Sequence, residues 1–123
     1  MALIMIVEDE EITIKILASY VKRMGHIPVK FRDGLSAWNF LQENSDIVGA
    51  LITDLVMPEL DGYSLIDKIR GSEKTVELPI IVQSDYLGVK GTVVLMEKGA
   101  SVVYPKPLSF EDLEEHILEY IKE

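Results

Sequence analysis

The sequence predicts an α/β domain whose parallel β-sheet is covered by helices on both faces. Short apolar runs rich in β-branched residues alternate along the chain with amphipathic stretches. Several of these runs are almost continuously apolar, which is typical of strands buried on both faces. Strict alternation of strands and helices indicates right-handed βαβ units and therefore a parallel sheet. The length of 123 residues suits one domain, which we expect to span residues 1–123.

Five strands are expected, with the second and the fifth at the edges of the sheet. The apolar runs are Leu3–Val7, Ile27–Phe31, Val48–Thr53, Pro79–Gln83 and Ser101–Tyr104. The second run is interrupted by Pro28 and Lys30, and the fifth begins with Ser101. Because proline has no N–H to donate to a neighbouring strand, it is found mainly in edge strands. These polar or proline-containing runs therefore belong at the edges.

Five helices are expected in the remaining stretches. Their ranges are Glu10–Met24, Gly34–Glu43, Ser64–Arg70, Leu87–Lys98 and a last helix that opens at Ser109. Each carries apolar residues three or four positions apart, which places them on one helix face. The fourth helix has the lowest helix propensity, because Gly88 and Gly91 each cost about 1 kcal/mol relative to alanine.

Composition and charge exclude several classes of protein. The chain has no cysteine, which excludes a disulfide scaffold and any zinc or iron–sulfur site made of thiolates. The formal charge of −9 disfavours direct nucleic-acid binding and suits basic partners or divalent cations, although it also serves solubility. The apolar start of the chain is too short for a signal peptide or a membrane span. We expect a cytoplasmic protein without membrane contact.

Charged and hydroxyl side chains follow four of the five expected strands. Glu8 and Asp9 follow the first strand, Asp54 the third, Ser84 the fourth and Lys106 the fifth. Ligands of open parallel sheets bind beyond the carboxyl ends of the strands, where these side chains are expected to meet.

Each of these residues also has an ordinary structural interpretation. Acidic residues after a strand favour the positive end of the next helix, and Glu10 and Glu11 are explained in this way. Asp54 alone would serve as a cap for the following turn, and Lys106 alone as a solvated loop lysine. Taken together, these interpretations require four coincidences at one edge of the sheet, so a shared site is the better hypothesis.

The chemistry of this group points to a divalent cation and a phosphoryl group. Carboxylates packed together repel one another, and a hard, oxygen-seeking cation relieves the repulsion. Carboxylates with water suit Mg²⁺, or else Mn²⁺. A cation beside a lysine and a hydroxyl group can neutralise a phosphoryl group, and a carboxylate can be the nucleophile that forms an aspartyl phosphate.

The run from Asp54 to Gly62 resembles the phosphoacceptor loop, D-x-x-M-P-x-x-D-G, of response regulator receiver domains, the CheY-like superfamily of two-component signalling. Glu8-Asp9, Ser84, Lys106-Pro107 and Gly99-Ala100 also stand where this family has its other signature residues. The resemblance covers the whole chain. It implies a flavodoxin-like (βα)5 three-layer sandwich with strand order 2-1-3-4-5.

The resemblance also implies a metal site and its ligands. Asp9 and Asp54 would bind Mg²⁺ directly, the carbonyl oxygen of Val56 would be a third ligand, and Glu8 would act through water. Lys106 would pair with Asp54.

For phosphotransfer, the resemblance implies that Asp54 accepts a phosphoryl group from a phosphohistidine on a sensor histidine kinase or a histidine phosphotransfer domain. Lys106 would then contact the phosphoryl oxygens, and the Ser84 hydroxyl would swing onto them and report phosphorylation. The peptide bond between Lys106 and Pro107 would be cis. Such a domain catalyses only its own phosphorylation and slow dephosphorylation, so we do not expect an enzyme in the usual sense.

Two positions depart from the family pattern. Asp85 stands where the family usually has alanine or glycine; we expect its side chain to turn outward and to slow phosphorylation by small-molecule donors. Val103 occupies the usual position of the switch aromatic. Tyr104, one residue later, should point to the opposite face of the strand and serve packing. The fourth helix, which contains Gly91, offers another way to transmit the signal.

Further expectations concern lifetime and partners. Val56 and Tyr86 would flank the path of a hydrolytic water and cannot readily orient it, which predicts a long-lived phosphoaspartate. Ile12 and Ile16 lie one turn apart on the first helix, either at the margin of the core or as a docking patch for the phosphohistidine partner. A homodimer and the identity of the downstream protein partner are left open, as is whether the domain stands alone.

Two alternative functions were weighed. A hydrolase of the haloacid dehalogenase type also uses an aspartate nucleophile with Mg²⁺, but it needs a second acid where this chain has Val56, and the chain has no room for a cap domain. A phosphorylation-independent pseudo-receiver, which only binds partners, is kept open by Asp85. The complete set of site residues favours a working receiver.

Overall fold

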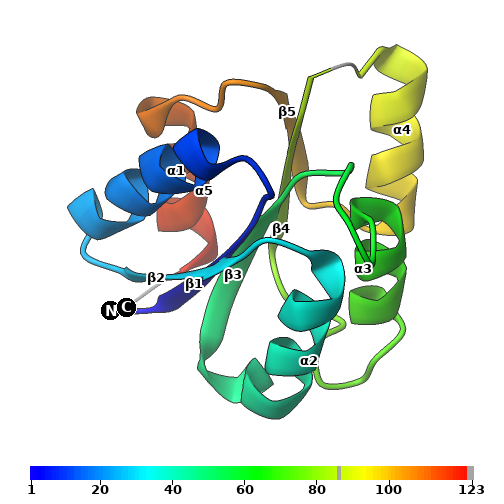
Figure 1. Cartoon of the computed structure of the whole chain (residues 1–123), viewed down its shortest axis with the longest axis horizontal. Coiled ribbons are helices and arrows are strands. Elements are labelled where there is room, and N and C mark those ends of the chain that lie inside the picture. The colour runs from blue at the N-terminus through cyan, green and yellow to red at the C-terminus, as the bar shows by residue number, and fades with distance from the viewer. Residues whose placement is uncertain (86, 122–123) are drawn as a thin grey trace.

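The computed structural model describes residues 1–85 and 87–121 and has five parallel strands in one sheet (Figure 1). The strand order is β2-β1-β3-β4-β5, as the resemblance implies. The strands are β1 (Leu3–Val7), β2 (Ile27–Phe31), β3 (Val48–Thr53), β4 (Ile80–Ser84) and β5 (Val102–Pro105). The first three agree with the sequence prediction. The last two lie one residue further along, and β2 and β5 are the edge strands, so the prediction for the edges is confirmed.

Helices cover both faces of the sheet, with α1 and α5 on one side and α2, α3 and α4 on the other (Figure 1). Their bounds are α1 (Glu11–Arg23), α2 (Gly34–Asn44), α3 (Gly62–Arg70), α4 (Val89–Lys98) and α5 (Phe110–Tyr120), and a 3₁₀ turn, η1 (Ser45–Ile47), links α2 to β3. The three-layer α/β architecture predicted from the sequence is therefore confirmed.

Alternation along the strands divides the core into two layers. Ile4 and Ile6 of β1 pack with the α1–α5 layer, whereas Met5 and Val7 pack with the layer of α2, α3 and α4. Because successive side chains of a strand point to opposite faces, both layers need apolar residues. This requirement explains why the central strands read as continuous apolar runs.

Side-chain caps fix where three of the helices begin. Asp33 accepts a hydrogen bond from the backbone N–H of Ser36, Asp61 from that of Ser64, and Ser109 from that of Asp112. Such caps satisfy backbone donors that the first helical turn leaves unpaired. The cap at Asp61 also sets the end of the loop that joins β3 to α3, so the helix begins earlier than the sequence predicted.

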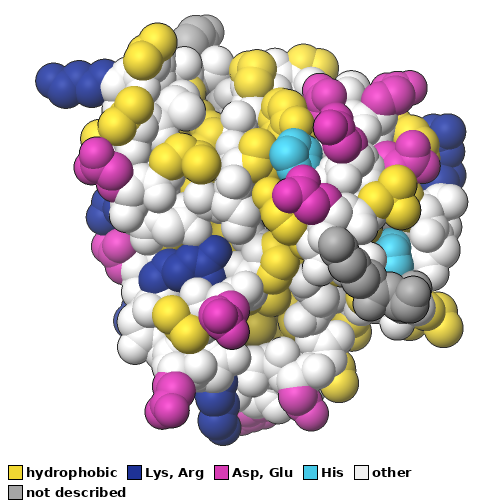
Figure 2. All heavy atoms as spheres, turned by 180° about the vertical axis from the view of Figure 1, so that it is seen from behind, with side chains coloured by type: hydrophobic (Ala, Val, Ile, Leu, Met, Phe, Trp, Pro, Cys, Tyr) yellow, Lys and Arg dark blue, Asp and Glu magenta, His cyan; other side chains and the backbone are white. Residues whose placement is uncertain are grey.

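Two surfaces differ sharply in chemistry. The helix α4 exposes Val89, Val93, Val94 and Met96, and hydrophobic side chains are visible over it at the upper left of Figure 2. Acidic side chains gather over α5 on the opposite side of that view. No helix in the described part of the chain is long and apolar enough to cross a membrane.

Candidate functional site

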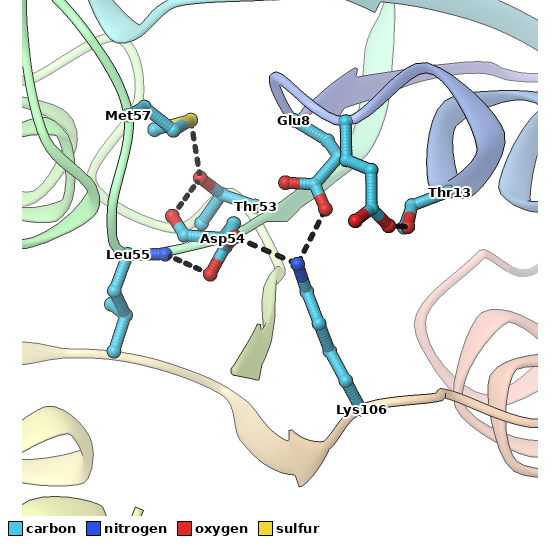
Figure 3. A network of polar contacts seen from close by, with 8 residues as sticks. Glu8, Thr13, Thr53, Asp54, Leu55, Met57 and Lys106 are labelled. Atoms are coloured by element: carbon cyan, nitrogen blue, oxygen red, sulfur yellow. Dashed lines mark hydrogen bonds and ion pairs between the residues drawn. The ribbon is translucent and has the colours of Figure 1, made fainter. Parts of the chain in front are cut away.

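The carboxyl ends of β1, β3, β4 and β5 bring together the side chains that follow them. Figure 3 shows Glu8, Asp54 and Lys106 pointing toward one another from three different segments. Asp9 follows Glu8, and Ser84 is the last residue of β4. The convergence expected from the topology of a parallel sheet is present in the structure.

Lys106 joins two carboxylates at the centre of this site. Its Nζ donates hydrogen bonds to Glu8 Oε1 at 2.5 Å and to Asp54 Oδ2 at 2.8 Å. The side chain of Glu8 is fully buried, and those of Asp54 and Lys106 are 11% and 14% exposed. Removing three charges from water is costly, and the shared ammonium offsets part of that cost. One cation facing two carboxylates leaves the group with an excess of negative charge.

One backbone hydrogen bond and the Lys106 ammonium hold the Asp54 carboxylate in one orientation. The backbone N–H of Leu55 donates to Asp54 Oδ1 at 2.6 Å, while Lys106 holds the other oxygen. The backbone N–H of Asp54 in turn donates to the carbonyl oxygen of Val7, 3.0 Å away. The backbone N–H of Lys106 donates to the carbonyl oxygen of Ser84 at 3.0 Å, which ties the ends of β4 and β5 together. The peptide bond from Lys106 to Pro107 is cis.

Three carboxylates form a cluster that fits a divalent cation. One oxygen from each of Glu8, Asp9 and Asp54 lies within 4.8 Å of the others. Glu8 Oε2 is buried and has no hydrogen-bond partner among the described residues, so one acceptor is left unused. An all-oxygen donor set of this kind suits Mg²⁺ or Mn²⁺ rather than zinc.

Burial and charge shift the acid–base properties of this cluster. Burial raises the pKa of Glu8 to about 7, and the negative charge of Asp54 acts in the same direction, although the hydrogen bond from Lys106 opposes both. Burial by itself lowers the pKa of Lys106, but its hydrogen bonds to Asp54 and Glu8 outweigh that effect and raise the pKa. The ammonium therefore stays charged, and Glu8 holds a proton more tightly than an exposed carboxyl does.

The loop after Asp54 forms one wall of a cavity beside the carboxylate. The cavity has a volume of about 360 Å³ and is lined by Asp54, Leu55, Val56, Tyr63, Ser84 and Asp85. A hydrogen bond closes the loop at its end: the backbone N–H of Gly62 donates to the carbonyl oxygen of Leu55 at 2.8 Å. A side chain at Gly62 would have its Cβ only 2.3 Å from the carbonyl oxygen of Asp54, so this position requires glycine.

Gly34 is a residue that the sequence analysis did not connect with the site. A Cβ at this first position of α2 would lie 1.9 Å from the carbonyl oxygen of Leu60, in the loop after Asp54. The contact joins segments far apart in the sequence, so local patterns do not reveal it. The only sequence signal is a glycine at the start of a helix that Asp33 already caps.

The positions that depart from the family pattern lie as follows. Asp85 is exposed at the mouth of the cavity. Val103 packs with the layer of α2, α3 and α4, whereas Tyr104 packs with the α1–α5 layer, so the predicted opposite orientation is confirmed. The Tyr104 hydroxyl lies 2.6 Å from His116 Nε2, within hydrogen-bonding distance. Tyr86 lies outside the described residues.

The two isoleucines of α1 are both on the surface. Ile12 is 70% exposed and Ile16 is 44% exposed, whereas Ile14 and Leu17 of the same helix are buried. Of the two interpretations left open by the sequence, the margin of the core fits Ile12 poorly. Ile16 lines a second cavity, between α1 and the segment that follows β5.

Comparisons with known proteins agree with this geometry. The sequence matches the family model of the response regulator receiver domain over residues 4–118. It is 30% identical over 115 residues to a chemotaxis protein CheY homolog of Campylobacter jejuni subsp. jejuni, an alignment that covers 93% of this chain and 88% of the relative.

Solved structures show the same fold. A response regulator receiver protein from Pseudomonas putida has a TM-score of 0.85 and 30% identity, over 96% of both chains. The receiver domain of a sensor histidine kinase from Pseudomonas aeruginosa PAO1 has a TM-score of 0.86 and 22% identity, over 97% of this chain and 96% of that one. The crystal structure of that receiver domain has a magnesium ion coordinated in the active-site cleft.

Receiver domains are signalling domains of two-component systems and are phosphorylated by histidine kinases. In this chain the sequence match, the strand order and the acidic pocket around Asp54 agree with one another. The chain belongs to the response regulator receiver domain family.

Proposed function

We propose that Asp54 is the phosphoacceptor and that its donor is a phosphohistidine on a sensor histidine kinase or a histidine phosphotransfer domain. The observation that carries this proposal is the position of the Asp54 carboxylate, which lines the cavity while Lys106 holds one of its oxygens. In the reaction, a carboxylate oxygen of Asp54 forms a bond to phosphorus as the phosphorus–nitrogen bond of the donor breaks. The departing imidazole nitrogen keeps the electron pair of that bond.

The neighbouring residues have distinct roles in this proposal. Asp9, Asp54 and the carbonyl oxygen of Val56 hold Mg²⁺, or Mn²⁺ in its place, and Glu8 acts through water. The cation supplies positive charge that neutralises the transferring phosphoryl group. The cluster of Glu8, Asp9 and Asp54 oxygens and the unpartnered Glu8 Oε2 support this assignment.

Lys106 and Ser84 act on the product of the transfer. The Lys106 ammonium, already beside Asp54, contacts the new phosphoryl oxygens, and the Ser84 hydroxyl donates to them. The end of β4 then carries the change toward α4. Val103 stands at the usual position of the switch aromatic and Tyr104 packs on the other face of β5, in the α1–α5 layer, so the switch does not use an aromatic side chain at the usual position.

The substitution Asp54→Asn tests the phosphoacceptor. We expect it to abolish phosphate uptake from a phosphohistidine donor, measured by gel shift or radiolabel, because the amide is a poor nucleophile. The matched control is Asp46→Asn, an exposed aspartate in η1, at the opposite end of β3 from Asp54. Phosphate uptake that persists in the Asp54→Asn variant contradicts the proposal.

The same geometry bears on the other candidate functions. A pseudo-receiver that works without phosphorylation is not favoured, because Glu8, Asp9, Asp54 and Lys106 are all in place.

We infer a protein of the cytoplasm that acts on itself and not on a separate substrate. We place its phosphohistidine partner over Ile12 and Ile16 of α1, and its charge of −9 disfavours nucleic acid as a direct partner.

A further inference from the structure

Asp85 lies between two cavities at the carboxyl end of the sheet. It contributes to the wall of the cavity beside Asp54 and to the wall of the second cavity, of about 210 Å³, between α1 and the segment after β5. It directly follows Ser84, the last residue of β4. A phosphodonor that reaches Asp54 through the first cavity therefore comes close to Asp85.

The carboxylate of Asp85 has no structural partner in the described part of the chain. The residue is exposed, and none of the described residues forms a hydrogen bond or an ion pair with it. By contrast, Asp33 and Asp61 cap the helices that follow them. Asp85 also stands before Gly88, the cap of α4, and therefore outside the first helical turn, where a carboxylate favours a helix. Helix capping does not explain this carboxylate.

The two cavities are poor in positive charge. Among the described residues of their walls, Lys106 is the one basic side chain, and its ammonium already donates to Glu8 and Asp54. One of its three N–H groups is left for a phosphoryl oxygen. A divalent cation in the carboxylate cluster would offset the charge of its own ligands, but Asp85 is not a member of that cluster. Its negative charge therefore remains at the mouth of the site.

A fixed negative charge repels an anionic donor in proportion to the charge that the donor carries. Acetyl phosphate is a dianion near neutral pH, whereas phosphoramidate, whose nitrogen is protonated, has a single net negative charge. The repulsion depends on distance and not on a particular contact, so it acts whichever way the exposed side chain turns. Because Asp85 is at the surface, water weakens the repulsion, and we expect an effect of about tenfold on the rate with a dianion.

Both donors give the same product. An oxygen of Asp54 forms the bond to phosphorus in each reaction. With acetyl phosphate, the phosphorus–oxygen bond breaks and acetate leaves with the electron pair. With phosphoramidate, the phosphorus–nitrogen bond breaks and the protonated nitrogen leaves as ammonia. A difference between the donors in their response to Asp85 therefore reports on the charge of the donor.

We propose that Asp85 is a specificity-determining residue that selects phosphodonors by their charge. It disfavours free acyl phosphates, which approach Asp54 as dianions without any other contact. A phosphohistidine protein offsets the repulsion with contacts along α1, where Ile12 and Ile16 are exposed. Charge selection by Asp85 thus limits phosphorylation of Asp54 in the absence of the partner protein. This inference rests on the proposed function of Asp54.

The substitution Asp85→Asn tests the selection, because it removes the charge and keeps the size of the side chain. We expect phosphorylation by acetyl phosphate, followed by intact mass spectrometry with excess Mg²⁺ at low ionic strength, to be about tenfold faster than in the wild type. The gain with phosphoramidate should be about threefold, since its charge is half as large. Both gains should shrink at high salt. The matched control is Asp46→Asn, an exposed aspartate in η1, which should leave both rates unchanged.

The substitution Asp85→Ala separates charge from size, because it removes both. We expect it to accelerate the reaction with acetyl phosphate about as much as Asp85→Asn does. An unchanged rate in Asp85→Asn, acceleration in Asp85→Ala alone, or equal gains with the two donors overturns the proposal.

A phosphohistidine donor distinguishes failure of the selection from failure of the proposed function. If Asp54 takes up phosphate from that donor but Asp85→Asn accelerates neither small donor, the selection by Asp85 is wrong and the phosphoacceptor stands. If Asp54→Asn still takes up phosphate, the phosphoacceptor is wrong, and the selection that rests on it fails as well.

Discussion

The carboxylates of Glu8 and Asp54 share the single ammonium group of Lys106. The resulting excess of negative charge determines how the site responds to protons and cations. Glu8 is the most buried of the three, and its Oε2 has no partner among the described residues. A proton or a divalent cation can each relieve the excess negative charge. The two should therefore affect stability through the same carboxyl group.

The raised pKa of Glu8 predicts a specific pH dependence of stability. Its pKa is about 7 in the folded protein, against an ordinary value of 4.5, so the folded state binds the proton more tightly than the unfolded chain does. The contribution of Glu8 to the free energy of unfolding is therefore greatest at pH values below 4.5, the ordinary pKa of the group. It falls as the pH rises from 4.5 to 7, and the difference corresponds to about 3 kcal/mol at most.

Comparing the wild type with Glu8→Gln isolates this effect. Urea unfolding with a chelator present, at several values between about pH 5 and 8, should show the Gln variant gaining stability relative to the wild type as the pH rises. Other titrating groups contribute to both proteins and cancel in the difference. A constant difference across this range would show that Glu8 titrates as an exposed carboxyl does.

Residues that directly follow buried strands were predictable from the sequence, and residues that depend on contacts between distant segments were not. Asp54 and Lys106 could be placed at one edge because the topology of a parallel sheet brings strand ends together. The opposite orientations of Val103 and Tyr104 follow from alternation along β5. Nothing local indicates that the amide nitrogen of Gln83 would lack a hydrogen-bond partner among the described residues, since that depends on what α1 and the segment after β5 place beside it.

At the scale of elements, the start of α2 packs closely against the loop that follows the phosphoacceptor. Gly34 opens α2, and its backbone lies so close to Leu60 that a Cβ there would meet the carbonyl oxygen at 1.9 Å. The same loop includes Glu59, which has a positive φ of 67°, and it ends at the Asp61 cap of α3. A shift at Leu60 would be transmitted along a short, constrained segment to Val56 and Asp54.

The substitution Gly34→Ala should therefore weaken the metal site as well as the fold. Because the obstructing atom is backbone, the loop must move, and we expect a loss of stability of about 1–3 kcal/mol. The affinity for Mg²⁺ and the rate of phosphorylation should fall even where the protein remains folded. Gly88→Ala is the control, since a Cβ there meets nothing within 4 Å. Unchanged Mg²⁺ affinity in Gly34→Ala would show that the loop adjusts without moving the ligands.

The helix α4 is attached to the core less extensively than α1. Leu95 is its one fully buried residue, whereas α1 buries Ile14, Leu17, Ala18 and Val21. Elements with few buried contacts open locally at low free-energy cost.

Amide hydrogen exchange should reveal this difference between the helices. We expect α4 amides to exchange at least about tenfold faster than those in the middle of α1. Addition of beryllofluoride and Mg²⁺ should change the exchange of α4 more than that of α1, because Ser84 lies at the end of β4, shortly before α4. Equal protection of the two helices would contradict a role for α4 in transmitting the signal.

At the scale of the whole molecule, where the acidic residues lie matters more than the net charge of −9. The helix α5 lies on the same side of the sheet as α1 (Figure 1), and acidic side chains are visible over it on the surface in Figure 2. These charges are exposed to water and are screened by salt. The cluster of Glu8, Asp9 and Asp54 is partly buried, so screening relieves its repulsion much less than a bound cation does.

This contrast predicts that Mg²⁺ stabilises the protein more than NaCl at equal ionic strength. A ligand that binds only the folded state adds about 1.4 kcal/mol to the free energy of unfolding when its concentration is ten times its Kd. We expect Mg²⁺ to raise the melting temperature by a few degrees beyond the effect of NaCl. Asp9→Asn should remove that difference because it deletes one ligand oxygen, whereas Asp46→Asn, on the surface, should keep it. Equal shifts with the two salts would mean that general screening, and not occupation of the carboxylate cluster, accounts for the stabilisation.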